Sequence, residues 1–155
     1  MNLYKITNFD TNNGPGFRVS IWFSGCSIKC NGCHNKELWD ETKGHHLTLE
    51  DAKQVCELLK HPGIAGISLL GGEPIKLHNA TDLAELRDFC KYIKEQYPNK
   101  SIWLWTGYLV NRLKRANLEV LNYIDVVVDG PYKAHLRDTS LAFRGSSNQT
   151  ITYLH

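Results

Sequence analysis

Three closely spaced cysteines are the residues of this chain with the clearest chemical potential. Cys26, Cys30 and Cys33 follow a C-x3-C-x2-C spacing, which allows three thiolates of one loop to converge on a single metal centre. Thiolates are the ligands that iron–sulfur clusters use. A 4Fe–4S cluster held by three cysteines keeps one iron free of protein ligands, and that iron can bind a substrate, as the open position of a catalytic zinc does.

Three other interpretations of these cysteines are open. A structural zinc site would combine them with His45 or His46. The segment from Cys30 to His34 reads C-x-x-C-H, which is the attachment motif of c-type haem. That motif belongs to exported proteins, however, and it leaves Cys26 unexplained. A redox-active C-x-x-C pair of the thioredoxin type leaves Cys26 without a role as well.

The remaining cysteines and the N-terminal residues indicate the compartment. The first ten residues contain no basic start followed by an apolar stretch, so we expect no signal peptide and a reducing cytoplasm. Disulfides are rare in that environment. Cys56 and Cys90 fall on the apolar faces of two expected helices, and we interpret both as core residues.

The overall charge excludes some classes of partner. The 155 residues include 18 basic and 16 acidic side chains without long runs of either sign, for a net charge of +2. Such a balance predicts neither nucleic-acid binding nor attraction to an anionic membrane. No apolar run approaches the roughly 20 residues that a membrane-spanning helix needs.

Short apolar runs alternate with helical patterns along the chain. The residues after the Thr48 to Asp51 capping box have helical periodicity. Two more helices are expected over 83–97, ended by Pro98, and over 110–123. The strand patterns cover 17–23, 65–70, 101–105, 124–128 and, in the tail, 150–153.

This alternation predicts an α/β fold. Right-handed crossovers place the C-terminal ends of successive parallel strands along one edge of a sheet. A complete eight-unit barrel needs roughly 200 residues or more. For a single domain over residues 1–155 we therefore expect a shortened, open (β/α) partial barrel with mainly parallel strands.

A glycine turn at the end of the second expected strand gives the first family resemblance. Gly71-Gly72-Glu73-Pro74 follows 65–70, and by itself such a turn is an ordinary strand exit. Together with the C-x3-C-x2-C loop after the preceding strand, it resembles the two hallmarks of the radical S-adenosylmethionine (SAM) superfamily. Glycines let a backbone approach a ligand closely, and a carboxylate can bind an ammonium group.

Further motifs resemble one branch of that superfamily, the anaerobic ribonucleoside-triphosphate reductase activating proteins. They are Asn13-Gly-Pro-Gly16, Trp105-Thr-Gly-Tyr108, Asp129-Gly-Pro-Tyr132 and Arg144-Gly-Ser-Ser-Asn-Gln149. The resemblance thus extends from residue 13 to residue 149. One departure is His34, which stands where the family commonly has an aromatic residue after the third cysteine; histidine can still stack on adenine.

The resemblance implies a reaction and its cofactors. A 4Fe–4S cluster on Cys26, Cys30 and Cys33 would cleave SAM reductively, with electrons from a low-potential donor such as flavodoxin. The resulting radical would take a hydrogen atom from a glycine of anaerobic ribonucleoside-triphosphate reductase. Pyruvate formate-lyase or another glycyl-radical enzyme is an alternative partner, and a non-enzymatic zinc or haem carrier is the alternative class. No general acid–base pair is evident.

The resemblance also implies which residues bind SAM. The Gly71-Gly72-Glu73 turn would bind the methionine amino end, and the Gly32-Cys33-His34 backbone would lie beside the adenine. Thr106 and Asp129 stand at strand ends facing the same site, where they either order SAM or a cation or simply cap their strands. Trp105 and Tyr108 are interpreted as wall and core, and Arg144 to Gln149 as either a partner-docking or a loop-bracing segment.

Overall fold

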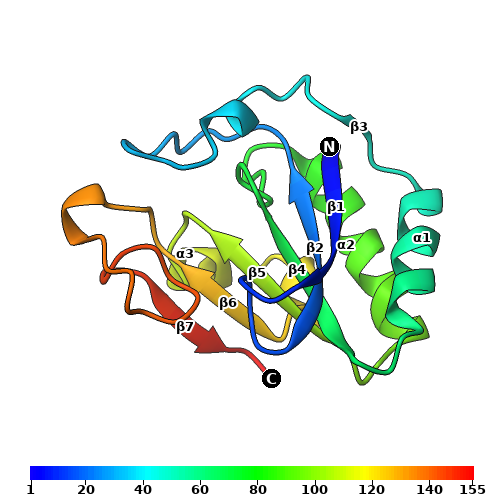
Figure 1. Cartoon of the computed structure of the whole chain (residues 1–155). Helices are drawn as coiled ribbons and strands as arrows, with labels where there is room; N and C mark the ends of the chain where they lie inside the picture. Colours follow the sequence, from blue (N-terminus) through cyan, green and yellow to red (C-terminus); the bar gives the residue numbers. More distant parts are fainter.

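The computed structural model describes all of residues 1–155 and is built around a seven-stranded sheet (Figure 1). The strands lie in the order β3-β1-β2-β4-β5-β6-β7. Their bounds are β1 Asn2–Asp10, β2 Phe17–Phe23, β3 His45–His46, β4 Ile64–Gly71, β5 Ser101–Thr106, β6 Val126–Asp129 and β7 Thr150–Tyr153. The sheet is open, with β3 and β7 at its edges.

Only the central strands of this sheet are parallel. β2, β4, β5 and β6 pair in parallel, as the alternating pattern predicts, whereas β1, β3 and β7 pair antiparallel with their neighbours. The five predicted strands are confirmed, but β1 and β3 were not predicted. β1 has two register irregularities against β2, between Leu3 and Lys5 and between Thr7 and Asp10. These interrupt the period-two alternation by which a strand is recognised.

Three helices supply the main core on one face of the sheet. They are α1 Leu49–Leu59, α2 Ala80–Gln96 and α3 Val110–Arg115. α1 begins with the predicted capping box of Thr48 and Asp51. Cys56 and Cys90 are buried in this core, as expected. None of the helices is both long enough and apolar enough to cross a membrane.

The helix predicted over 110–123 is interrupted. α3 ends at Arg115, and a separate 3-10 turn follows over Glu119–Tyr123. Between them, Asn117 has a φ of 52°. Asparagine tolerates this left-handed conformation better than most residues, and one such residue is enough to end a helix. The apolar periodicity continued across the break because both segments pack on the same core.

The other face of the sheet holds a fully buried arginine near the start of the parallel strands. Arg18 of β2 donates from Nε to the Ser68 hydroxyl over 2.8 Å, and from a terminal nitrogen to the carbonyls of Ile67 and Ser101 over 2.7 and 2.9 Å. Its guanidinium also lies over the Trp103 ring. Burial lowers the pKa of Arg18 to about 10. Arg18 thus connects β2 to β4 and β5.

The tail segment Arg144 to Gln149 braces the loop that follows β6. The Gln149 side chain donates to the Gly130 carbonyl over 3.0 Å and accepts from the backbone N–H groups of Gly145 and Ser146. Asn148 donates to the Pro131 carbonyl over 2.7 Å. Of the two roles considered for this segment, these contacts establish loop bracing.

We predict that Arg18→Met lowers the free energy of unfolding by about 2–4 kcal/mol, because buried carbonyls lose a charged donor that methionine cannot replace. Urea denaturation under anaerobic conditions measures this change. Arg87→Met is the matched control, since Arg87 makes only exposed ion pairs and its removal should change stability little. An Arg18→Met protein as stable as the control would contradict the connecting role.

Candidate functional site

The predicted site residues meet at the C-terminal edge of the four parallel strands. The register pairs Phe23 with Gly71 and Thr106 with Asp129, so the loops that leave these strands start side by side. A cavity of about 360 Å³ opens there. It is lined by most of the predicted residues, namely Cys26, Cys30, Cys33, His34, Gly71, Gly72, Glu73 and Thr106. Gly32 and Asp129 lie outside its lining.

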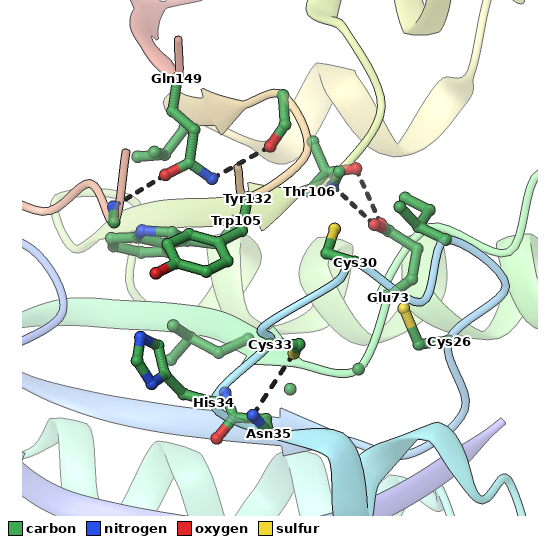
Figure 2. Close-up of a pocket in the computed structure, with 18 of the residues that line it drawn as sticks. Cys26, Cys30, Cys33, His34, Asn35, Glu73, Trp105, Thr106, Tyr132 and Gln149 are labelled. Carbon is green, nitrogen blue, oxygen red and sulfur yellow. Dashed lines mark hydrogen bonds between the residues drawn. The ribbon is translucent and has the colours of Figure 1, made fainter. Parts of the chain in front are cut away.

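The three clustered cysteines surround one end of this cavity as free thiols (Figure 2). All three are half-buried, and the backbone N–H of Asn35 donates to the Cys33 sulfur over 3.4 Å. Burial raises the pKa of the Cys30 thiol, and the nearby Cys26 and Cys33 raise it further. No three potential ligands are close enough to hold a single metal ion. A four-iron cluster is larger and keeps its thiolates further apart, so this all-sulfur donor set fits the cluster.

The histidines of the zinc alternative are engaged elsewhere. His45 lies 2.8 Å from the Asp51 carboxylate in α1, and His46 lies 2.8 Å from the Glu85 carboxylate in α2. Both belong to β3, at the edge of the sheet. The structure therefore gives no support to a zinc site that combines the three cysteines with either histidine.

The glycine turn after β4 packs directly on the base of the cysteine loop. A Cβ atom on Gly72 would stand 2.5 Å from the Gly25 carbonyl oxygen and 2.7 Å from that of Leu38. The turn also donates two backbone hydrogen bonds, from Gly72 to Phe23 over 2.8 Å and from Glu73 to Gly25 over 2.9 Å. Gly72 is thus required for the approach of two backbone segments, a reason that the sequence did not reveal.

Glu73 is buried beneath this turn, with 2% of its surface exposed. Its carboxylate accepts from the Thr106 hydroxyl over 2.7 Å and the Gly107 N–H over 2.7 Å (Figure 2). It also accepts from the Ile75 N–H over 2.9 Å. Burial raises the pKa of Glu73 to about 7, although these hydrogen bonds by themselves lower it. A carboxylate offers about four acceptor positions. Glu73 therefore links β4 to β5 and keeps one position for a further donor.

Lys76 is a site residue that sequence analysis missed. Its ammonium group donates to the carbonyls of Ser24, over 3.1 Å, and of Gly25. Burial lowers the pKa of Lys76, whereas the Glu73 carboxylate raises it. Lys76 thus binds the two carbonyls at the base of the cysteine loop. Its only sequence signal is its position three residues after Glu73.

Thr106 caps the end of its own strand, whereas Asp129 caps the start of α3. Thr106 donates to Glu73 and accepts from the Tyr108 N–H over 3.2 Å. One oxygen of Asp129 accepts from the Val110 N–H over 2.7 Å, while the other is buried without a hydrogen-bond partner. Strand-end capping, one of the two roles considered, is therefore present at Thr106, while Asp129 caps a helix.

The end of the cysteine loop rests on the loop after β6. The rings of His34 and Tyr132 have their centroids 5.3 Å apart, and a Cβ on Gly32 would lie 3.2 Å from Ala134. Tyr132 was quoted within a motif but given no role by the sequence. Because the tail braces this same loop, residues far apart in the chain cooperate to position His34.

Comparison with known proteins agrees with this geometry. Residues 12–152 match the family described as a 4Fe-4S single cluster domain. The chain is 38% identical over 151 residues to the anaerobic ribonucleoside-triphosphate reductase-activating protein of Enterobacteria phage T4, covering 97% of this chain and 93% of that protein. It is 38% identical over 156 residues to the Escherichia coli K12 protein of the same name, covering 99% of each. The Vibrio cholerae protein of that name is also 38% identical, with 97% of each covered. The chain therefore belongs to the family of anaerobic ribonucleoside-triphosphate reductase-activating proteins.

Proposed function

We propose that this protein is a radical SAM activase that forms a glycyl radical on anaerobic ribonucleoside-triphosphate reductase. One observation carries the proposal: three free cysteines and the Gly71-Gly72-Glu73 turn line the same cavity at the C-terminal edge of the parallel strands. The relatives bear the name of activating proteins for that reductase. Activation of another glycyl-radical enzyme, such as pyruvate formate-lyase, is the alternative within the same chemistry.

Each half of the site has a proposed task. Cys26, Cys30 and Cys33 hold the cluster. Glu73 and the glycines before it bind the methionine amino end of SAM, and the segment from Gly32 to His34 lies beside the adenine. When bound, the cluster supplies the electron that cleaves SAM into methionine and a deoxyadenosyl radical. The radical would take a hydrogen atom from a glycine of the reductase, leaving 5′-deoxyadenosine and the glycyl radical.

The protein's own contribution is to bind, orient and exclude water. Apolar side chains from three different elements line the cavity, among them Ile28, Leu70 and Trp105. A site that keeps water out protects a reactive intermediate from side reactions. Glu73 offers its remaining acceptor position to the SAM amino group. Its carboxylate is held in place by Thr106 and two backbone N–H groups.

The proposal has a structural and a cellular part. We infer that residues 1–155 act as one radical SAM domain and that the open sheet is a shortened partial barrel. The protein would work in the cytoplasm with a low-potential donor such as flavodoxin, without nucleic-acid or membrane partners. Thr106 and Asp129 would, beyond capping, border bound SAM or a cation.

The decisive experiment combines the reduced protein, SAM and the cognate reductase under anaerobic conditions. We expect SAM cleavage together with a doublet in electron paramagnetic resonance from a glycyl radical on the reductase. Cleavage without that doublet would exclude this partner, and activation of pyruvate formate-lyase would replace it. Stoichiometric zinc or haem in the purified protein would instead favour a carrier.

We predict that Cys26→Ala, Cys30→Ala and Cys33→Ala each lose the cluster or hold it unstably. Iron and sulfide analysis of anaerobically purified protein measures this loss, with about four of each expected in the wild type. Cys56→Ala and Cys90→Ala are the matched controls, because both lie in the core. They should keep the cluster and lose only packing energy, on the order of 1 kcal/mol. An intact cluster in Cys30→Ala would refute the ligand assignment.

We predict that SAM affinity rises as the pH increases from 6 to 8, because Glu73, with a pKa of about 7, becomes ionised and accepts from the SAM amino group. Glu73→Gln should bind SAM about tenfold to a hundredfold more weakly at pH 8 and lose most of the rise. Anaerobic calorimetry measures both effects. The exposed Glu37→Gln is the control and should match the wild type. An equal rise in Glu73→Gln would assign the titration to another group.

A further inference from the structure

Three buried hydrogen-bond donors without partners line the cavity. They are the ring nitrogens of Trp22 and Trp39 and the Nε atom of Arg144. Buried donors are nearly always paired, since an unpaired one costs about 1–3 kcal/mol. All three are donors, and an occupant with acceptor oxygens or nitrogens would suit this part of the lining; the two unpaired buried acceptors, Asp129 Oδ1 and Asn148 Oδ1, belong to residues outside it.

Arg144 differs from the two tryptophans because it carries a full charge. It is the only lysine or arginine in the cavity lining, and no carboxylate lies within 4.0 Å of it. Its one hydrogen bond is a long one, 3.5 Å from a terminal nitrogen to the Gln149 carbonyl. Arg18, by contrast, donates to three acceptors on two strands, β4 and β5. Arg144 is therefore the unsatisfied cation of the site.

The position of Arg144 separates it from the proposed SAM ligands. Figure 2 shows Gln149 and Trp105 across the cavity from His34 and Asn35. Arg144 belongs to the same tail as Gln149, whereas the SAM ligands lie on the cysteine loop and at the end of β4. The acceptor for Arg144 is thus expected from a second occupant.

The surface outside the cavity indicates the chemistry of that occupant. In Figure 1 the cysteine loop and the loop after β6 project from the same side of the sheet. The latter loop carries the exposed basic residues Lys133 and Arg137. Asp138 is the only acidic residue between positions 130 and 138. A basic rim beside the half-buried Arg144, whose Nε is unpaired, suits a peptide segment with acidic side chains or free carbonyl groups.

We propose that Arg144 binds a carbonyl or carboxylate oxygen of the partner's glycine-bearing segment when that segment enters the cavity. This inference rests on the proposed function, because it takes the substrate to be a protein. Gln149 and Asn148 hold the backbone around Arg144 in place, so the segment that carries the guanidinium is ordered before the partner arrives. Such preorganisation reduces the entropy lost on binding.

The test compares Arg144→Gln and Arg144→Lys with Arg137→Gln, each with its cluster loaded. Arg137 lies on the same basic rim but not in the cavity lining. Two quantities are measured: the affinity for the cognate reductase, and the number of glycyl radicals formed per SAM cleaved. We expect Arg144→Gln to lower either or both by about tenfold to a hundredfold, the range of one charge-assisted hydrogen bond. Arg144→Lys should lose less, and Arg137→Gln should change both by less than about threefold.

Other results would overturn the proposal in distinguishable ways. Wild-type reductase affinity and radical yield in Arg144→Gln would remove Arg144 from partner binding. A parallel loss of SAM affinity in that variant would assign Arg144 to SAM. If Arg144→Gln fails to keep its cluster, Arg144→Lys decides by the same two measurements. Wild-type protein that cleaves SAM without forming a glycyl radical would refute the proposed function itself, and this inference with it.

Discussion

At Gly72, two backbone segments approach more closely than any side chain would allow. The Gly25 and Leu38 carbonyls occupy the space where a Cβ would stand, and the Gly72 and Glu73 N–H groups donate to the base of the cysteine loop. Lys76 reinforces the same contact from below. The loop that carries the proposed cluster ligands is therefore fixed to the turn that carries the proposed SAM ligand. Displacing one of them displaces the other.

This arrangement places an ionisable group where its charge is unfavourable. Burial raises the pKa of Glu73 to about 7, from an ordinary value of 4.5. A raised carboxyl pKa means that the folded protein holds the proton more tightly than the unfolded chain does. The resulting stabilisation is complete below about pH 4.5 and is lost as the pH rises through about 7. Near neutral pH, a donor that reaches the free acceptor position of Glu73 therefore stabilises its ionised form. This is the role proposed for the amino group of SAM.

The sequence predicts those parts of the molecule that depend on local pattern. The parallel strands, the α1 capping box and the clustering of Cys26, Cys30 and Cys33 all follow from spacing along a few residues. β1 was missed because register irregularities disrupt its alternation, and the end of α3 because a single left-handed residue, Asn117, interrupts an apolar pattern that otherwise continues.

The other features depend on contacts between distant residues, for which a single sequence holds no signal. The engagement of His45 by Asp51 removes a candidate zinc ligand, yet the sequence alone left it available. The bond from Gln149 to Gly130 joins the tail to the loop after β6, and this long-range contact, which the sequence does not show, gives the tail its bracing role. Glu73 lines the same cavity as the three cysteines, but its three internal hydrogen bonds appear only after β4 and β5 are paired.

The two walls of the cavity differ in the charge of their unpaired hydrogen-bond donors. On the side of the cysteine loop and the glycine turn, the Glu73 carboxylate is bonded within the protein, and the unpaired donors are the uncharged ring nitrogens of Trp22 and Trp39. The wall built by the tail retains Arg144 with its buried Nε unpaired, although Gln149 and Asn148 hold its neighbours firmly. An unpaired buried donor destabilises the free protein, and an acceptor on a partner relieves that destabilisation only in the complex. The charge on this wall would then favour the partner-bound state, in which a reactive radical is enclosed by two proteins and not by the 155 residues of this one.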